Sequence, residues 1–300
     1  MLVLVGGHES AAGGELADYA RPHPDTLVCP TGRPLLRALT ALLTDSAGGP
    51  GPVTAPGVSA PAKSATGVPA PICVVPMTLG RDLELVADTA RTLAALPAGR
   101  VLLAQPFGTT EHLIGWLRAA ARRTVLGADD AVLIAAHAAG PDPDAELSRV
   151  ARLVRQYGRH RLVETAYLAG DPDLAEGLDR CRRLGAARIT VVGAGFAAVA
   201  PPRQDPAQPA GAATSAGPLL SPAAISAVLA ARSAAARHAF ETRADDGIAT
   251  GLAAAGHGHT HEHDDHHDHP HPHPHPHPHP HQTPTPTQAH APAHPHARTH

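Results

Sequence analysis

The sequence is short of several residues on which common functional classes depend. Its three cysteines, Cys29, Cys73 and Cys181, lie far apart and form no CxxC pair, which argues against a disulfide scaffold, a cysteine zinc site and an iron–sulfur cluster. No apolar run approaches the roughly 20 residues that span a bilayer. The start, MLVLVGGHES, has no basic flank and no cleavage site, and it predicts a strand rather than a signal peptide. We therefore expect a cytoplasmic protein with reduced thiols and no membrane partner.

Positive charge is also scarce. Lysine and arginine together number 24 against 27 acidic residues, and the formal net charge is −3. A protein that binds nucleic acid through its phosphates is normally basic, because it neutralises the backbone with lysine and arginine. We therefore expect no nucleic-acid partner.

Histidine is the residue in excess, and its distribution is uneven. Of the 23 histidines, 17 lie between His257 and His300. Alternating His-Pro cannot form a helix, because proline removes a donor and clashes with the preceding turn, so we expect a disordered, polyproline-like tail. Imidazoles at this spacing can converge on a divalent ion. The expected ligands are His257, His259, His261, His263, His266, His267 and His269. The alternative is a low-complexity expansion without a selected function.

Three segments have too little apolar surface to form packed core. They are 46–70, 201–217 and 256–300, all rich in proline and small or polar residues. Removing them leaves a first block over 1–127, a second block over 128–252, and the tail over 253–300. We predict that 46–70 and 201–217 are flexible excursions from the two blocks.

The two blocks repeat one order of segments, which indicates an internal duplication. Matching pairs are 3–10 with 132–140, 26–43 with 162–185, 72–79 with 189–196, and 105–123 with 217–239. Pro34 and Ile72 are 38 residues apart, whereas Pro172 and Ile189 are 17 apart. The 21-residue difference is close to the 25 residues of 46–70, which therefore resembles an insertion into one copy.

Short apolar strands separated by amphipathic helices predict an α/β fold. The strands do not alternate polar and apolar residues, as expected of parallel sheets that are buried on both faces. Helices are predicted over 85–96 and 146–157 from their turn-spaced apolar residues. We expect two similar units that face each other across a cleft, each a small parallel sheet with helices on both faces. Ligands of such sheets bind beyond the carboxyl ends of the strands.

His8 is the first candidate for chemistry. It follows an apolar strand and two glycines, Gly6 and Gly7, which permit a tight turn and the close approach of a flat ligand. Imidazole binds cobalt, nickel, iron and zinc and accepts a proton near neutral pH. The alternative is a histidine in a surface loop that caps the next helix.

Several segments in this order resemble the sirohydrochlorin cobaltochelatase family (CbiX type, class II tetrapyrrole chelatases) in its two-unit form. They are the strand followed by GGHES, ICVVPMTLGRD, QPFGTTEHL, and VETAYLAGDPDL with RLGAARITVV. The resemblance covers about 2–252. It implies a chelatase that inserts a divalent metal into a tetrapyrrole without ATP. Co²⁺ for cobalamin biosynthesis is the expected metal, with Ni²⁺ or Fe²⁺ as alternatives and no further cofactor.

The resemblance also assigns roles. His8 takes the position of the family's metal ligand and base. The second family histidine is expected just after PMTLG, where this chain has Arg81 and Asp82 instead. Asp82 is then a second catalytic and metal-binding candidate, because a carboxylate can bind a divalent ion and accept a proton. It is equally placed to cap the helix that follows.

The implied substrate carries several carboxylates, which arginine forks and backbone N–H groups recognise. Arg33 and Arg81 lie in suitable turns, although both could equally be solvated. Ser10 belongs to the His8 turn. Glu164 lies where the family often has an acidic residue facing the cavity, and the alternative is a carboxylate at a strand edge.

The second block departs further from the family pattern. His137 ends its first strand in the turn AAHAAG, which lacks the glycine and serine of the family, and we expect it to matter less than His8. His112 is expected at a helix start in a structural role. Two other functions stay open: a non-catalytic protein that stores or delivers Co²⁺ or Ni²⁺, and a small-molecule enzyme on a periplasmic-binding-like fold. A metal donor and the next enzyme of the pathway are further expected partners.

Overall fold

A computed structural model describes residues 1–47, 70–124, 127, 129–158, 160–202 and 212–254. The described residues belong to one compact unit. Among the described residues, no helix combines the length and the apolar character that a membrane crossing needs. The predicted insertion at 46–70 falls almost wholly outside these ranges, and so does the histidine-rich tail.

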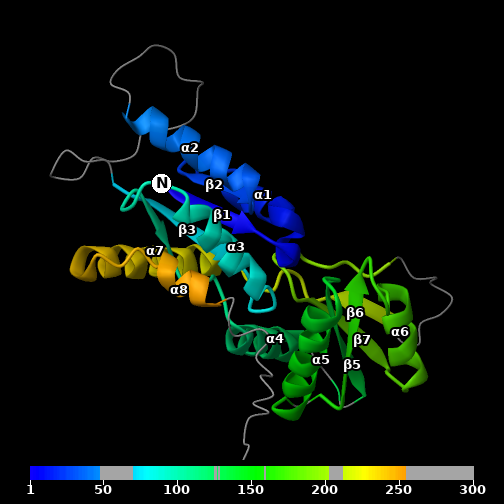
Figure 1. Ribbon diagram of the computed structural model, residues 1–300. Coiled ribbons are helices and arrows are strands. Elements are labelled where there is room, and N and C mark those ends of the chain that lie inside the picture. Colours follow the sequence, from blue (N-terminus) through cyan, green and yellow to red (C-terminus); the bar gives the residue numbers. More distant parts are fainter. Residues whose placement is uncertain (48–69, 125–126, 128, 159, 203–211, 255–300) are drawn as a thin grey trace, which may run out of the picture. The chain divides into compact units, whose positions relative to one another are not determined.

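The fold is α/β and contains two parallel sheets of the same order. The first sheet has the order β2-β1-β3-β4 and the second β6-β5-β7-β8 (Figure 1). The strands of the first are β1 (Leu2–Gly6), β2 (Thr26–Pro30), β3 (Ile72–Met77) and β4 (Val101–Leu103). Those of the second are β5 (Asp130–His137), β6 (Leu162–Leu168), β7 (Arg188–Gly193) and β8 (Ala212–Ser215). All six pairings are parallel, which confirms the predicted fold class.

Helices connect the strands. A 3-10 segment η1 (His8–Leu16) and α1 (Ala17–Ala20) follow β1. The longer helices are α2 (Arg33–Ala47), α3 (Leu83–Ala94), α4 (Thr110–Thr124), α5 (Pro141–Gln156), α6 (Leu174–Arg183) and α7 (Pro222–Arg243). A short helix, α8 (Ile248–Ala253), follows α7. Asp82, Asp173 and Ser221 are the N-cap residues of α3, α6 and α7. The side chain of each accepts a hydrogen bond from a backbone N–H group in the first turn of its helix.

Two strands were not predicted from the sequence. β4 contains three residues and β8 reads AATS, so neither carries the β-branched run that marked the other strands. β8 lies within 201–217, and the prediction that this whole segment is a flexible loop is therefore wrong for Ala212–Ser215, which pairs with β7. Residues 203–211 lie outside the described ranges.

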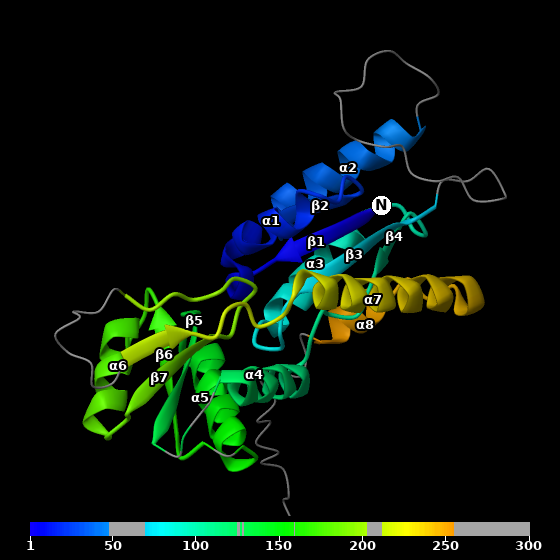
Figure 2. The ribbon, with the colours of Figure 1, turned by 180° about the vertical axis from the view of Figure 1, so that it is seen from behind.

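The halves exchange helices, which the division into sequence blocks does not capture. α4 follows the first sheet in the chain but packs against α5 and β7, whereas α7 and α8 follow the second sheet and pack against the first (Figures 1 and 2). Leu103 of β4 donates a backbone hydrogen bond to Asp246, just before α8 (2.8 Å). One buried cluster accordingly joins β1 and β3 to β5 and α5.

The three cysteines are free and buried. Burial raises the pKa of Cys29 to about 11 and that of Cys181 to about 12. Both therefore stay protonated near neutral pH and are poor metal ligands.

Candidate active site

In each sheet the strand order reverses at the first strand, so that the chain continues to one side of this strand and then crosses to its other side. The central strand, β1 or β5, pairs with the next strand in the chain on one side and with β3 or β7 on the other. In open α/β sheets, ligands usually bind beyond the carboxyl ends of the strands at such a point. His8 follows β1 at this edge, Asp82 follows β3, and His137 is the last residue of β5.

His8 and Asp82 form a close pair. Asp82 Oδ2 lies 3.0 Å from His8 Nδ1 and accepts the backbone N–H of His8 at 3.1 Å. Asp82 Oδ1 accepts the backbone N–H of Leu85 at 3.0 Å. The other ring nitrogen, His8 Nε2, is buried and has no hydrogen-bond partner within the described part of the chain. A carboxylate that binds Nδ1–H leaves the lone pair of Nε2 available to a proton or a metal ion.

The two glycines before His8 make this pair possible. A Cβ atom on Gly7 would overlap Asp82 Oδ2, and one on Gly6 would overlap the backbone at Gly13. Glycine is therefore required at both positions for η1 to fold back over β1 and for the Asp82 carboxylate to reach the imidazole.

The Asp82 carboxylate is held in its charged form. Burial acts to raise its pKa, but the hydrogen bond and positive charge of His8, together with backbone N–H groups of Leu85 and His8, outweigh burial and lower the pKa below 3.8. Both oxygens of Asp82 are occupied by these contacts. The side chain of Asp82 therefore caps α3, as one of the two interpretations of the sequence predicted, and also orients the imidazole of His8.

Glu9 is a fully buried acid next to His8. Its Oε2 accepts hydrogen bonds from the Thr78 hydroxyl and from the backbone N–H of Leu79 (2.9 Å), while Oε1 is buried without a partner among the described residues. Burial is the main cause that raises its pKa above 4.5, against the opposing effects of Thr78 and the nearby Arg81. Glu9 therefore fixes the turn after β3 to the turn after β1.

The second half has its own histidine–carboxylate pair, but the carboxylate comes from the first half. His137 Nε2 lies 2.7 Å from Glu15 Oε1. The other oxygen of Glu15 accepts the backbone N–H groups of Phe196 and Ala197, each at 2.9 Å, in the turn after β7. Glu15 thus ties η1 to both strand ends of the second sheet.

Strand register explains this crossing. Gly6 pairs with Met77, and the equivalent Ala135 pairs with Gly193. Asp82 is five residues beyond Met77, so its counterpart five residues beyond Gly193 is Ala198. The second half has no acid at that position. Glu15 contacts the ring of His137, as Asp82 contacts that of His8, and it holds the turn after β7, as Glu9 holds the turn after β3.

Arg81 connects the two pairs. Its side chain is fully buried, and its Nη2 donates to the carbonyl of His137 (3.4 Å) and to Asp144 Oδ1 (3.3 Å), while Nε donates to Pro143 O (3.2 Å). Asp144 also accepts the N–H groups of Ala139 and Gly140. Arg81 therefore positions the start of α5 through Nε and Nη2, while its buried Nη1 has no hydrogen-bond partner among the described residues.

The two other expected substrate-binding residues of the first half, Ser10 and Arg33, differ in burial. Ser10 is fully buried, and its hydroxyl donates to Gly7 O (3.2 Å) and accepts Gly13 N–H (3.1 Å), which shapes the turn around His8. Arg33 begins α2 and is exposed. These placements give Ser10 an indirect role beside His8 and give Arg33 no contact with the His8–Asp82 pair.

Glu164 lies away from the histidines. It pairs in register with Leu133, whereas His137 pairs with Leu168, four residues further along β6. At about 3.3 Å per residue this is about 13 Å of strand. His112, in the first turn of α4, accepts the Thr109 N–H (3.2 Å) and stacks on Trp116, which is a structural role as expected.

Within the described residues, no group of three or more histidine, cysteine, aspartate or glutamate side chains is arranged to hold a metal ion. The His8–Asp82 pair offers one free ring nitrogen. Any metal there would complete its coordination with ligands from elsewhere, such as water or a bound macrocycle. The seven predicted tail ligands, His257, His259, His261, His263, His266, His267 and His269, lie outside the described residues.

The sequence reasoning missed Glu9, Glu15 and Asp144. Glu9 and Glu15 are separated from their partners by 70 and 122 positions. Glu9 was visible as an acid directly beside a candidate histidine. Nothing local distinguishes Glu15 or Asp144 from ordinary helix-start acids, since their partners become neighbours only through the exchange between halves.

No protein-family model and no curated protein matches the sequence. Among solved structures, sirohydrochlorin chelatase SirB from Bacillus subtilis subspecies spizizenii, in complex with cobalt, matches with 15% identity and a TM-score of 0.44, covering 82% of this chain and 98% of that one. SirB from Bacillus subtilis with Fe³⁺ matches with 13% identity, the same TM-score and the same coverage.

A multi-domain protein from Deinococcus radiodurans, described as structurally similar to chelatases and carrying two additional novel domains, matches with 19% identity and a TM-score of 0.44. The match covers 78% of this chain and 54% of that protein, so the chain spans about half its length.

Proposed function

We propose that this chain inserts a divalent metal ion, Co²⁺ in the first place, into a carboxylated tetrapyrrole of the sirohydrochlorin type without ATP. The observation that carries the proposal is the state of His8. Asp82 fixes one ring nitrogen, and within the described ranges the other has no partner. The ring lies at the sheet edge where α/β folds bind ligands. The order of motifs that resemble the cobaltochelatase family supports the choice of reaction.

Metal insertion needs a base, because two pyrrole N–H protons leave as the metal ion enters. His8 Nε2 accepts such a proton, and Asp82, charged near neutral pH, stabilises the imidazolium that forms. The same nitrogen can first hold the incoming ion, since neutral imidazole binds first-row divalent metals. The ion passes to the four macrocycle nitrogens, and the protons pass to solvent.

Asp82 acts in this proposal as the residue that positions His8. Its two oxygens are occupied by Nδ1, by the His8 backbone and by the Leu85 N–H, which leaves it poorly placed to bind the metal itself. A carboxylate behind a ligating histidine fixes the ring and raises its basicity. This arrangement requires no second histidine after β3.

An absorbance assay tests the reaction. Sirohydrochlorin is incubated with Co²⁺, Fe²⁺ or Ni²⁺, with and without the full-length protein, and the initial rate of metallation is recorded at fixed pH. We expect the protein to accelerate insertion of at least one metal. A protein that binds these metals at high stoichiometry but leaves every insertion rate unchanged would be a storage or delivery protein. Faster insertion of Fe²⁺ than Co²⁺ would indicate a siroheme-type ferrochelatase.

We assign the histidine-rich tail to metal supply rather than to chemistry. Deleting 256–300 should remove most of the bound divalent metal, because the deletion removes 17 of the 23 histidines. The insertion rate should be unchanged at saturating metal and lower at limiting metal. Equal slowing under both conditions would place the tail in the active site. Metal binding by the tail should weaken below about pH 6.5, where imidazole takes up a proton.

A further inference from the structure

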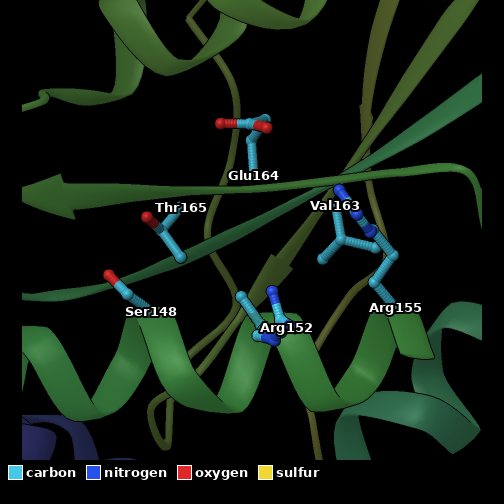
Figure 3. A pocket seen from close by; sticks show the side chains of 7 residues that line it. Ser148, Arg152, Arg155, Val163, Glu164 and Thr165 are labelled. Carbon is cyan, nitrogen blue, oxygen red and sulfur yellow. The ribbon is translucent and has the colours of Figure 1, made fainter. Parts of the chain in front are cut away.

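A polar cavity of about 290 Å³, open to solvent on the side of its exposed arginines Arg152 and Arg155, lies between α5 and the edge strand β6, away from both histidine pairs. It is lined by Ser148, Ala151, Arg152, Arg155, Val163, Glu164 and Thr165. In Figure 3, Arg152 and Arg155 extend from α5 toward β6, and Val163 and Thr165 project from β6 toward the helix. Two guanidinium groups and two hydroxyl groups therefore border one hollow, whose volume is close to that of the smallest ligand pockets.

The acids of α5 do not neutralise these two arginines. Asp142 lies in the first turn of the helix, at the end opposite to these arginines, and Asp144 is held by Arg81 and by two backbone N–H groups. Glu146 accepts hydrogen bonds from Nε and Nη2 of Arg149 at 2.7 and 2.8 Å. For Arg152 and Arg155, no ion pair forms with any residue that the structure describes. The cavity therefore has two positive charges whose partners are not supplied by the helix that carries them.

The one acid of the lining lies on the other face of the strand. Successive side chains of a strand alternate between faces, and Figure 3 shows the Glu164 carboxylate on the side of β6 opposite to Val163 and Thr165. Its charge acts on Arg180 and Cys181 of α6. Glu164 thus contributes its backbone to the cavity and its charge to the α6 side.

We propose that this cavity binds a phosphate group carried by a small molecule. Arginine pairs bind phosphate oxygens bidentately through their planar forks, and the hydroxyl of Thr165 is suited to complete the contacts. The hydroxyl of Ser148 donates to the carbonyl of Asp144 (3.3 Å) and would have to turn to reach the anion. The lining begins near the amino end of β6, whereas both histidine pairs lie beyond the carboxyl ends of the strands. The site is therefore separate from the proposed metal-insertion site and does not depend on it.

Titration calorimetry of the metal-free, full-length protein with inorganic phosphate tests the proposal. The buffer is held at about pH 8, where the tail histidines are neutral and do not attract anions. We expect saturable binding with a dissociation constant of roughly 1 mM or lower. The double variant Arg152→Gln/Arg155→Gln should weaken binding at least tenfold.

The matched control is Arg122→Gln/Arg123→Gln, which removes two exposed arginines from the last turn of α4. It makes the same change in net charge and in helix-end charge but leaves the cavity intact, so it should keep wild-type phosphate affinity. Equal weakening by both double variants would show a general charge effect and overturn the proposal. An absence of saturable binding to the wild type would do the same.

Two further measurements distinguish a phosphate site from a site for carboxylates. Citrate should bind at least tenfold more weakly than phosphate; tighter binding of citrate would make the site a carboxylate site. Phosphate at saturating concentration should leave the binding of metal-free sirohydrochlorin to the protein unchanged. Competition between phosphate and sirohydrochlorin would show that the arginines bind the carboxylates of the macrocycle, and the separate site would then be disproved.

Discussion

The two halves of the molecule place a histidine at the same point of the same sheet order, but they fix it through opposite ring nitrogens. In the first half Asp82 holds Nδ1 of His8, and Nε2 is unpaired among the residues that the structure describes. In the second half Glu15 occupies Nε2 of His137. The first arrangement leaves a buried nitrogen available for chemistry, whereas the second connects the halves. Two units of the same strand order thus differ in the use of this histidine, and only His137 joins the two sheets through a carboxylate of the other half.

The largest expected difference between the halves is in the rate of metal insertion. His8→Ala removes the proposed base and should lower the initial rate by roughly 10²-fold or more. His137→Ala should lower it by less than about tenfold, through weaker packing between the halves. The measurement is the insertion rate at fixed pH, with thermal melting of each variant as the control. If His137→Ala is the more damaging change at equal stability, the roles of the two histidines are reversed.

The residue before each histidine, Gly7 in the first half and Ala136 in the second, offers a mirrored pair of substitutions. A methyl group at Gly7 would displace the Asp82 carboxylate, so Gly7→Ala should lower the insertion rate roughly 10- to 100-fold, the usual cost of losing an orienting partner. Ala136→Gly, at the equivalent position of the second half, should change the rate less than about threefold. Equal effects of the two changes would mean that the close approach of Asp82 is unimportant.

Asp82→Asn separates orientation from backbone fit, because it leaves Gly7 in place. It should lower the insertion rate by a similar factor and shift its pH profile, whereas Asp82→Glu should restore part of the rate. The pKa of Asp82 is lowered on folding, so its charge stabilises the native state above pH 3.8 and this contribution is lost as pH falls below that value. The difference in melting temperature between wild type and Asp82→Asn should therefore narrow under acidic conditions.

Much of this architecture was readable from the sequence, because it depends on local patterns. Apolar runs near Val3 and Val132 predicted the parallel strands, and the paired spacing predicted two similar units. The pair of His8 and Asp82 was also within reach, since both follow strands that are neighbours in the sheet. The crossed pair of Glu15 and His137 was not, because it depends on how the halves pack and not on a pattern within either one.

Glu15 should therefore matter more for stability than for rate. Glu15→Ala removes three hydrogen bonds between the halves and leaves His137 without its acid, which should lower the free energy of unfolding by about 1–3 kcal/mol. The insertion rate at a temperature where the protein is folded should fall less than about tenfold. Urea unfolding gives the first quantity. A large loss of rate with unchanged stability would assign the second pair a catalytic role.

The last comparison concerns Glu9, a buried acid whose counterpart in the second half is Ala138. Its pKa is raised above 4.5 on folding, mainly by burial, so the native state binds this proton more tightly than the unfolded chain does. The free energy of unfolding therefore falls as pH rises above 4.5, by about 1.4 kcal/mol for each pKa unit crossed, until Glu9 is ionised in the folded protein. Glu9→Gln removes this ionisation.

Unfolding of the metal-free protein in urea, measured from about pH 4.5 to pH 8, should accordingly show wild type losing stability relative to Glu9→Gln as pH rises. The tail histidines titrate in both proteins and cancel in the difference. Parallel curves for the two proteins would mean that Glu9 has the same pKa folded and unfolded, so that the turn after β3 accommodates the charge fully. A gap that widens with pH would instead show that the first half accepts a destabilising charge beside His8, where the second half has a neutral alanine.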